Sequence, residues 1–344
     1  MYLSKNILKY KHMKYLSKIL LLYALGLSAC TGTKTPEASS PLFKPTPVVE
    51  LTCDGIRVAH LNTEFLFDGM GDEGGADFDW KGDPTKAAGH RKKVGEVIKS
   101  LNADVIHLAE VENTEVLEAL IAESMPGKGY KVYFVQGEDS FLGQDVAVIS
   151  RIPITETGRS NDRVKVGDTD RVYGVSKNLY ARFNIGDQPV TLIGLHFLAQ
   201  PDNIERKPQR EAQAEVIRRI AERETKMGRA VIVTGDFNDF DDAILDRNGN
   251  RPISSVMQTI KAVGRTTTDD DLHNIMADVP QILRFTSLWD KNQDNIATVN
   301  ELSAIDHMLV SKSLYGRLRS IGFIHSYNPL EVTDHFPVTA CFSK

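Results

Sequence analysis

Short apolar runs of four to seven residues recur from about residue 54 to the end of the chain, and amphipathic stretches with helical spacing lie between some of them. The runs have the length of buried strands; they are 56–61, 105–108, 131–136, 146–150, 179–184, 190–196, 230–234, 285–289, 306–311 and 338–342. Helices are predicted at 91–101, 116–124, 205–227 and 254–262. Strands outnumber long helices, and many are separated by short turns. The pattern therefore predicts an α/β (α+β) domain of two packed mixed sheets rather than one doubly wound parallel sheet.

The N-terminus has the pattern of an export signal. Lys14 and Lys18 precede an apolar run over residues 19–27, which is too short to span a bilayer comfortably. The small residues before Cys30 resemble the lipobox of bacterial lipoproteins, in which that cysteine is lipidated and becomes the mature N-terminus. An ordinary signal peptide or a buried apolar segment is the alternative.

Residues 31–50 are rich in Thr, Ser and Pro, a composition typical of a tether without a core-forming pattern. We therefore expect a signal peptide over 1–29, a lipidated cysteine and flexible tether over 30–52, and a folded domain over 53–344. The expected location is an exported, membrane-anchored lipoprotein, periplasmic or on the cell surface.

The chain is acidic once the signal is set aside. Five lysines and no acid lie in residues 1–29, so removing them takes the formal net charge from −5 to −10. That sign is wrong for a protein that holds a polyanion on a basic surface. A negative net charge suits a site that attracts divalent cations, in which the bound metal contacts the phosphate of the substrate.

Two further cysteines, Cys53 and Cys341, lie at opposite ends of the folded region. An exported protein can keep a disulfide. If the first and last strands are antiparallel neighbours, the two side chains lie close together and can form a bridge. Two isolated buried thiols are the equal alternative.

Polar side chains cluster where the apolar runs end, and strand ends that feed loops commonly carry function. Carboxylate and amide oxygens suit a hard cation such as Mg²⁺, and histidines can donate to phosphoryl oxygens. The candidates are Asn62, Glu64, Glu110, Glu112, His196, Asp236, Asn238, Asp239, Asp306, Asp334 and His335. Taken singly, an Asp or Asn after a strand is usually a turn or cap residue. His273 and His325 are expected to be structural or exposed, and only the joint pattern favours phosphate-ester chemistry.

Seven motifs in order resemble the endonuclease/exonuclease/phosphatase superfamily, also called DNase-I-like, over about residues 54–343. They are HLNTEFLFD (60–68), DVIHLAEVEN (104–113), QDVAVISRIPI (144–154), LHFLAQ (195–200), VTGDFND (233–239), IDHMLVS (305–311) and TDHFPV (333–338). The resemblance implies a four-layer α/β/β/α sandwich of two packed mixed sheets flanked by helices. It also implies a divalent-metal-dependent phosphoric ester hydrolase.

The resemblance implies a metal site in which Glu110 is the principal ligand and Asn62 lies beside it. Asp334 would be a second carboxylate near the metal. Asp236 would contribute to the metal site and orient or deprotonate the attacking water. The expected ion is Mg²⁺ or Mn²⁺, with Ca²⁺ as an alternative.

Phosphate contacts and proton transfer are implied for another set of positions. Asn238 would hold a phosphoryl oxygen and His196 would contact the phosphate. Asp306 would orient His335, which would bind the scissile phosphate or act as general acid–base. Two weaker candidates for phosphate contacts precede the His196 strand, namely Arg171 and Asn178. Glu64 matches a pattern that many bacterial members of the superfamily share, but the resemblance assigns no firm role to it.

Two acidic segments distinguish this chain from a minimal member of the superfamily that it resembles. The first is the Gly- and Asp-rich loop 68–89, whose acidic residues are Asp72, Glu73, Asp77, Asp79 and Asp83. A solvated surface loop is the favoured interpretation, and a flap over the site or a cation site is the alternative. The spacing of Asp290, Asn292 and Asp294, with Glu301 beyond them, resembles a Ca²⁺ loop. Asn295 occupies the glycine position of such a loop, so a hairpin turn is the favoured interpretation.

The leading function hypothesis is a phosphodiesterase or endonuclease acting on extracellular nucleic acid. No sequence-specific recognition motif accompanies it. The alternatives are a phosphatase or phosphodiesterase for an inositol phosphate or sphingomyelin, and a non-catalytic binding protein on the same fold. Apolar residues projecting from exposed loops would favour the lipid substrate. We expect a monomer, anchored to the membrane through its lipid, with no protein partner.

Overall fold

The computed structural model describes residues 40–47, 52–71, 74–138, 141–165, 170–266 and 268–344. The expected signal peptide, the lipidation at Cys30 and most of the tether lie outside these residues and stay predictions. In the described part of the chain no helix has the length and apolarity needed to cross a membrane.

Two six-stranded sheets form the centre of residues 40–344. The first has the order β15 (Leu318–Phe323), β16 (Val338–Phe342), β1 (Ile56–Leu66), β2 (Val105–Val111), β4 (Asp145–Ser150), β3 (Lys131–Phe134). The second has the order β11 (Leu272–Asn274), β14 (Asp306–Ser311), β10 (Ala230–Asp236), β9 (Gln188–His196), β8 (Lys177–Ile185), β5 (Glu156–Gly158). Two small ribbons are β6 (Arg163–Lys165) with β7 (Val172–Gly174), and β12 (Ser287–Leu288) with β13 (Leu302–Ser303).

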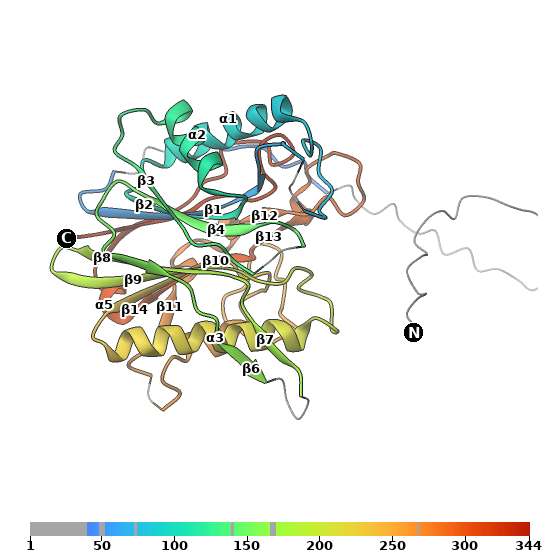
Figure 1. The fold of residues 1–344 in the computed structure, drawn as a ribbon. Helices are drawn as coiled ribbons and strands as arrows, with labels where there is room; N and C mark the ends of the chain where they lie inside the picture. The colour runs from blue at the N-terminus through green and yellow to red at the C-terminus, as the bar shows by residue number, and fades with distance from the viewer. Residues whose placement is uncertain (1–39, 48–51, 72–73, 139–140, 166–169, 267) are drawn as a thin grey trace, which may run out of the picture. The chain divides into compact units, whose positions relative to one another are not determined.

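Helices cover the outer face of each sheet, as Figure 1 shows. They are α1 (Pro84–Leu101), α2 (Thr114–Ser124), α3 (Lys207–Lys226), α4 (Val256–Lys261) and α5 (Lys312–Tyr315), with 3₁₀ turns η1 (Ile275–Asp278), η2 (Gln281–Leu283) and η3 (Val299–Glu301). Apolar residues of α1 and α2 pack on the first sheet, and those of α3 and α4 pack on the second. A third apolar cluster lies between the sheets. The expected four-layer α/β/β/α sandwich is confirmed.

Strand alternation places each side chain in one of these clusters. On β1, Val58 faces the other sheet, whereas Ala59 and Leu61 face the helices. On β2, Val105 and Ala109 likewise face the other sheet. Because side chains alternate along a strand, the even-numbered positions of β1 and the odd-numbered positions of β2 point into the space between the sheets.

Both sheets are built around a parallel pair flanked by antiparallel strands. In the first sheet β1 runs parallel to β2, and β16 and β4 flank them antiparallel. In the second sheet β9 runs parallel to β10, and β8 and β14 flank them antiparallel. The carboxyl ends of the parallel strands and the amino ends of their neighbours therefore meet at one edge of each sheet.

The structure corrects the predicted loop over 68–89 at its C-terminal end. Helix α1 begins at Pro84, because the Asp83 side chain accepts hydrogen bonds from the backbone N–H groups of Thr85 and Lys86. An Asp cap followed by Pro at the first helical position is a helix start signal. The predicted strand 285–289 is confined to β12. The strands that were not predicted are β5, β6, β7, β11, β13 and β15.

Two alternatives left open by the sequence are decided by pairing. Residues 289–301 connect the antiparallel strands β12 and β13, so this segment forms the predicted hairpin connection. The first and last long strands, β1 and β16, are antiparallel neighbours with Arg57 opposite Cys341. Cys53 and Cys341 are joined by a disulfide, with Cα atoms 5.8 Å apart.

Candidate active site

The register of the second sheet places three predicted residues in a row at its edge. Asp236 at the end of β10 lies opposite Asp306 at the start of β14 and beside His196 at the end of β9. His196 lies opposite Lys177, the first residue of β8. All four side chains belong to buried residues.

The first sheet contributes Asn62 and Glu110. The ladder between β1 and β2 shifts register after Asn62, and the β2–β4 ladder shifts between Ala109 and Val111. Glu110 lies at this irregularity with a φ of 63°. Bulges re-aim side chains at sheet edges, and this one directs Glu110 toward the other sheet's row.

Asn62 connects the two sheets. Its Nδ2 donates to Glu110 Oε1 at 3.1 Å and to Asp236 Oδ2 at 3.2 Å, and it lies 3.5 Å from His335 Nε2. Its Oδ1 accepts from the backbone N–H of Glu64 at 3.1 Å. Asn62 therefore orients both carboxylates, and its predicted role as a metal ligand stays a prediction.

Gly235 is required by the close approach of β9. A Cβ at Gly235 would lie 2.0 Å from the carbonyl oxygen of Leu195, and its φ is 153°. Beyond it, Asp236 Oδ1 accepts from the Asn238 backbone N–H at 2.8 Å, and Asn238 has a φ of 47°. Asn238 Nδ2 donates to the carbonyl oxygen of Phe197 at 3.2 Å. The Asp236 carbonyl oxygen also accepts from the Phe197 backbone N–H at 2.9 Å, so the turn is held to the residue that follows β9 by two hydrogen bonds.

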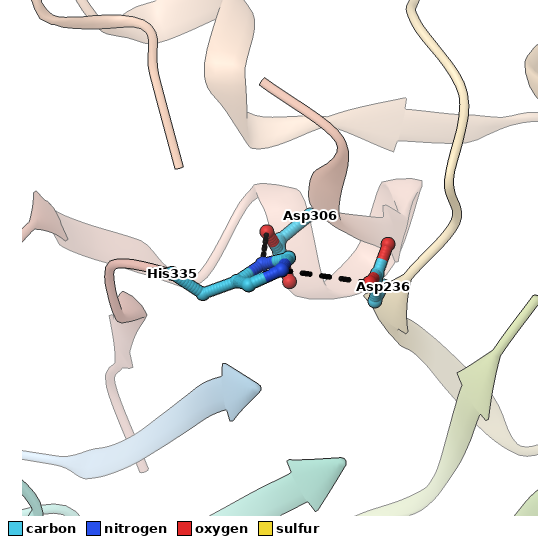
Figure 2. Close-up of side chains that lie close together, drawn as sticks. All are labelled: Asp236, Asp306 and His335. Carbon is cyan, nitrogen blue, oxygen red and sulfur yellow. Dashed lines mark hydrogen bonds and ion pairs between the residues drawn. The ribbon is translucent and has the colours of Figure 1, made fainter. Parts of the chain in front are cut away.

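His335 and Asp306 form a buried hydrogen-bonded pair (Figure 2). His335 Nδ1 lies 2.7 Å from Asp306 Oδ2, and its Nε2 lies 3.8 Å from Asp236 Oδ2. The hydroxyl of Tyr327 donates to the His335 carbonyl oxygen. Thr333 Oγ1 donates to the carbonyl oxygen of Asn62 at 2.9 Å, which fixes this loop against β1.

The electrostatics give the two histidines different protonation states. Burial lowers the pKa of His335, but the carboxylates of Asp306, Asp334 and Asp236 outweigh it and raise that pKa well above its ordinary value. Burial and the nearby charge of Lys177 lower the pKa of His196 well below its ordinary value. His196 is therefore neutral, with Nε2 at 3.7 Å from both Glu110 Oε1 and Asp236 Oδ2.

The donor set fits a divalent cation. Burial and the charge of Asp306 raise the pKa of Asp236 to about 8, and a bound cation would favour its ionised form. Asp236, Asp306 and His335 offer ligand atoms within 4.8 Å of one another. Asp306 already accepts from two imidazoles. Asp236 and Glu110 instead accept from amide N–H groups, so this pair is better suited to a hard cation.

The remaining predicted residues lie at different distances from this cluster. The Asp334 side chain is half-exposed, with Oδ1 at 3.8 Å from His335 Nε2. Glu64 Oε2 accepts from the Asp334 backbone N–H at 3.1 Å, which links β1 to the loop before β16. The side chain of Asn178 bonds the backbone of Ser160 and Val175. The exposed Arg171 lies directly before β7.

Three buried residues near the site were missed by the sequence reasoning. Lys177 Nζ donates to Gln144 Oε1 at 2.9 Å beside His196. His60 and His107 lie between the sheets and continue the hydrogen bonds of Asp306. The signal available for both histidines was a polar residue at an inward position of an otherwise apolar strand.

Similar solved structures share this fold at low identity. NExo, a 3′ phosphatase from Neisseria bound to a product DNA hairpin, has a TM-score of 0.53 at 15% identity, with 84% of this chain and 100% of that chain covered. A mannosyl-6-phosphatase from Bacteroides thetaiotaomicron has a TM-score of 0.51 at 18% identity, with 83% and 98% covered. TDP2 from Caenorhabditis elegans has a TM-score of 0.50 at 17% identity, with 84% and 74% covered. No match was found among curated proteins.

The fold and the site define a hydrolase of phosphate esters. The Endonuclease/Exonuclease/phosphatase family matches residues 60–335, and the chain belongs to this family. Its members depend on divalent metals. The matched range includes every residue of the buried cluster described above.

Proposed function

We propose that this chain is a divalent-metal-dependent phosphodiesterase that cleaves nucleic acid outside the cytoplasm. The observation that carries the proposal is that a hydrogen-bonded imidazole and a pair of carboxylates face each other across the site. On one side, Asp306 holds an imidazole whose Nε2 faces the cluster. On the other, Glu110 and Asp236 share the Asn62 amide donor, and their carboxylate oxygens, which can each accept more than once, would also hold a cation.

Each group then has a defined task. A divalent cation held by Glu110 and Asp236 would polarise a phosphoryl oxygen. Asp236 orients the attacking water, and Asn238 and His196 donate to the phosphoryl oxygens. As water attacks phosphorus, Asp236 would take the proton of that water, and His335 would pass its Nε2 proton to the oxygen that leaves when its P–O bond breaks. Asp306 holds the opposite nitrogen of His335. General acid–base catalysis of this kind contributes about 10²–10⁴-fold to a rate.

An aromatic stack beside Glu110 supports a nucleic acid substrate. The Phe65 backbone N–H donates to Glu110 Oε2 at 3.1 Å, and the half-buried Phe65 ring stacks on Phe78 at 4.7 Å between centroids. Trp80 continues the group and donates from Nε1 to the Phe65 carbonyl oxygen. Stacked aromatic rings next to a phosphate site suit unpaired bases, which stack on them without sequence preference.

A lipid phosphodiester is the second candidate, supported by a different observation. Met70 and Phe141 are 70% and 72% exposed. Their loops adjoin, because the Gly75 backbone N–H donates to the Phe141 carbonyl oxygen. Large apolar side chains that project from neighbouring loops are the feature expected of a protein that contacts a lipid surface.

Export as a lipoprotein is part of the proposal. The disulfide between Cys53 and Cys341 supports an oxidising compartment. The lipobox pattern before Cys30 and the Pro- and Ser-rich stretch after it support a tethered enzyme. Palmitate labelling of the expressed full chain, lost in Cys30→Ala, tests this part.

A substrate panel tests the activity. Residues 31–344 would be assayed with plasmid DNA, single-stranded DNA, RNA, inositol phosphates, sphingomyelin and a chromogenic phosphodiester, each with Mg²⁺, Mn²⁺ or Ca²⁺ and with chelator. Cleavage of nucleic acid that requires metal and is lost in His335→Ala supports the proposal. Hydrolysis of sphingomyelin alone, impaired by Phe141→Ser, selects the second candidate. Full activity in excess chelator overturns both.

A further inference from the structure

Two buried histidines occupy positions between the sheets where apolar residues would be expected. His60 on β1 and His107 on β2 are Cα partners in the parallel ladder, and both are fully buried. Their strand neighbours on the same face, Val58 and Val105, belong to the apolar cluster between the sheets. Burying an imidazole costs free energy unless its nitrogens are hydrogen-bonded, so these contacts need an explanation.

The two imidazoles continue the hydrogen bonds of the site into the interior. His335 Nδ1 lies 2.7 Å from Asp306 Oδ2, and His60 Nε2 lies 2.9 Å from Asp306 Oδ1. His60 Nδ1 in turn lies 2.9 Å from His107 Nδ1. Each carboxylate oxygen of Asp306 is therefore engaged by one imidazole, and a second imidazole lies behind His60.

The ionised carboxylate fixes which nitrogen carries each proton. An ionised carboxylate only accepts, so His335 donates from Nδ1 and His60 donates from Nε2. A His60 that carries its single proton at Nε2 has a lone pair at Nδ1, and His107 then donates from its own Nδ1 across the 2.9 Å contact. His107 Nε2 is left as an acceptor, and it is buried without a hydrogen-bond partner among the described residues.

We propose that His60 is a positioning residue for the catalytic pair, held in turn by His107. This proposal rests on the proposed function. A carboxylate bonded through one oxygen can rotate, whereas one bonded through both is fixed in plane. Because His60 occupies Oδ1, Oδ2 of Asp306 stays aligned with His335 Nδ1, and His335 Nε2 stays directed at the cluster. Groups that orient the partner of a reacting imidazole act in this way at metal sites.

Gly194 on the opposite sheet provides the space for His107. A Cβ at Gly194 would lie 2.2 Å from His107 Cδ2 and 2.4 Å from its Nε2. Gly194 is two residues before His196 on β9, so both lie on the same face of that strand. We call the hydrogen-bonded series His335–Asp306–His60–His107 the relay. Gly194 therefore leaves room for the ring at the inner end of the relay and contributes no polar side-chain atom.

Imidazole tautomers test the proposal independently of any substrate. Two-bond ¹H–¹⁵N spectra of the folded protein with ¹⁵N-labelled histidine would be assigned with the variants His60→Gln and His107→Phe. The expected protonated nitrogens are Nε2 of His60, Nδ1 of His107 and both nitrogens of His335. A proton on His107 Nε2 with none on its Nδ1, or a His60 protonated on both nitrogens, overturns the relay.

Kinetics test whether the relay positions His335. His60→Phe keeps the ring volume and removes the donor, so kcat should fall about 10–100-fold with KM within about twofold. His60→Gln retains a side-chain N–H directed at Asp306 and should recover most of that loss. Gly194→Ala should lower kcat in the same way, because it displaces His107 without removing a hydrogen-bonding group.

A buried histidine away from the relay provides the matched control. His325 stacks on Phe285 and bonds its carbonyl oxygen at 2.8 Å, so His325→Phe should lower stability without lowering kcat. Equal kcat losses in His60→Phe and His60→Gln, or a change in KM alone, overturn the positioning role. If His60→Phe does not fold, His107→Phe makes the same test one step further from the site. A wild-type chain inactive on every phosphate ester contradicts the proposed function, while the tautomer test still decides the relay.

Discussion

Asp236 and Asp306 lie opposite each other in the register of β10 and β14, yet their surroundings push their pKa values in opposite directions. Burial and the charge of Asp306 raise the pKa of Asp236 to about 8. Burial also opposes ionisation of Asp306, but His335 and His60 outweigh it and hold that pKa well below its ordinary value. Neighbouring carboxyl groups with divergent pKa values take different chemical roles. Asp306 is therefore suited to orienting an imidazole, whereas Asp236 is suited to binding a cation or accepting a proton.

His335 and Asp306 are expected to act as one unit. His335→Ala and Asp306→Asn should each lower kcat by about 10³-fold, because general acid–base catalysis contributes up to about 10⁴-fold. The double variant should lose less than about tenfold more than either single variant. Steady-state kinetics at saturating metal measure the three values, with circular dichroism as the check on folding. Losses that multiply in the double variant would show that the two residues act separately.

Asp236 is expected to make the metal-free protein less stable as the pH rises. Its folded-state pKa of about 8 lies above the unfolded value, so the stability it contributes is complete below the unfolded pKa and is lost as the pH rises through about 8. Asp236→Asn removes this titration. In the presence of chelator, the free energy of unfolding of the variant minus that of wild type should rise by at least about 1 kcal/mol from acid to alkaline pH. Urea unfolding of both chains across that pH range measures the difference, and a constant difference contradicts the assignment.

Glu110 is expected to be required for stabilisation by metal. A ligand at 100 times its Kd raises the free energy of unfolding by about 2.7 kcal/mol when only the folded state binds it. Mg²⁺ or Mn²⁺ should therefore raise the Tm of wild type and not that of Glu110→Gln. Glu112, whose Oε2 accepts from the Asp68 backbone N–H, supplies the control variant Glu112→Gln, which should keep the shift. An undiminished shift in Glu110→Gln would place the metal elsewhere.

The disulfide is expected to contribute strongly to stability. Cys53 and Cys341 are separated by 288 residues, and closing a loop of that length stabilises by roughly 5–6 kcal/mol in the chain-entropy account. The double variant Cys53→Ala and Cys341→Ala should lose most of this amount in denaturant unfolding. Reductant should destabilise wild type to a similar extent and leave the double variant unchanged. Equal stability of oxidised and reduced wild type would contradict the expectation.

Local patterns were enough to predict most of the strands and the residues at their ends. Strand length and apolar runs depend on neighbouring residues, so β2, β4, β9, β10, β14 and β16 were predicted close to their observed bounds. Asp236, Asn238 and His335 were singled out because a metal-dependent phosphate site needs their donor types, and their chemical roles stay predictions. The start of α1 was misplaced although Asp83 and Pro84 signalled it, because the Gly- and Asp-rich segment around them reads as a loop.

Only the tertiary structure decided which of these side chains touch. The sequence by itself determined a two-sheet α/β chain whose strands end in carboxylate, amide and imidazole groups, since both properties are local. Register between strands distant in the chain is set by packing of whole sheets, and one residue of slip would turn a side chain to the other face. That register placed Asp306 opposite Asp236, joined Cys53 to Cys341 and brought His60 and His107 behind Asp306.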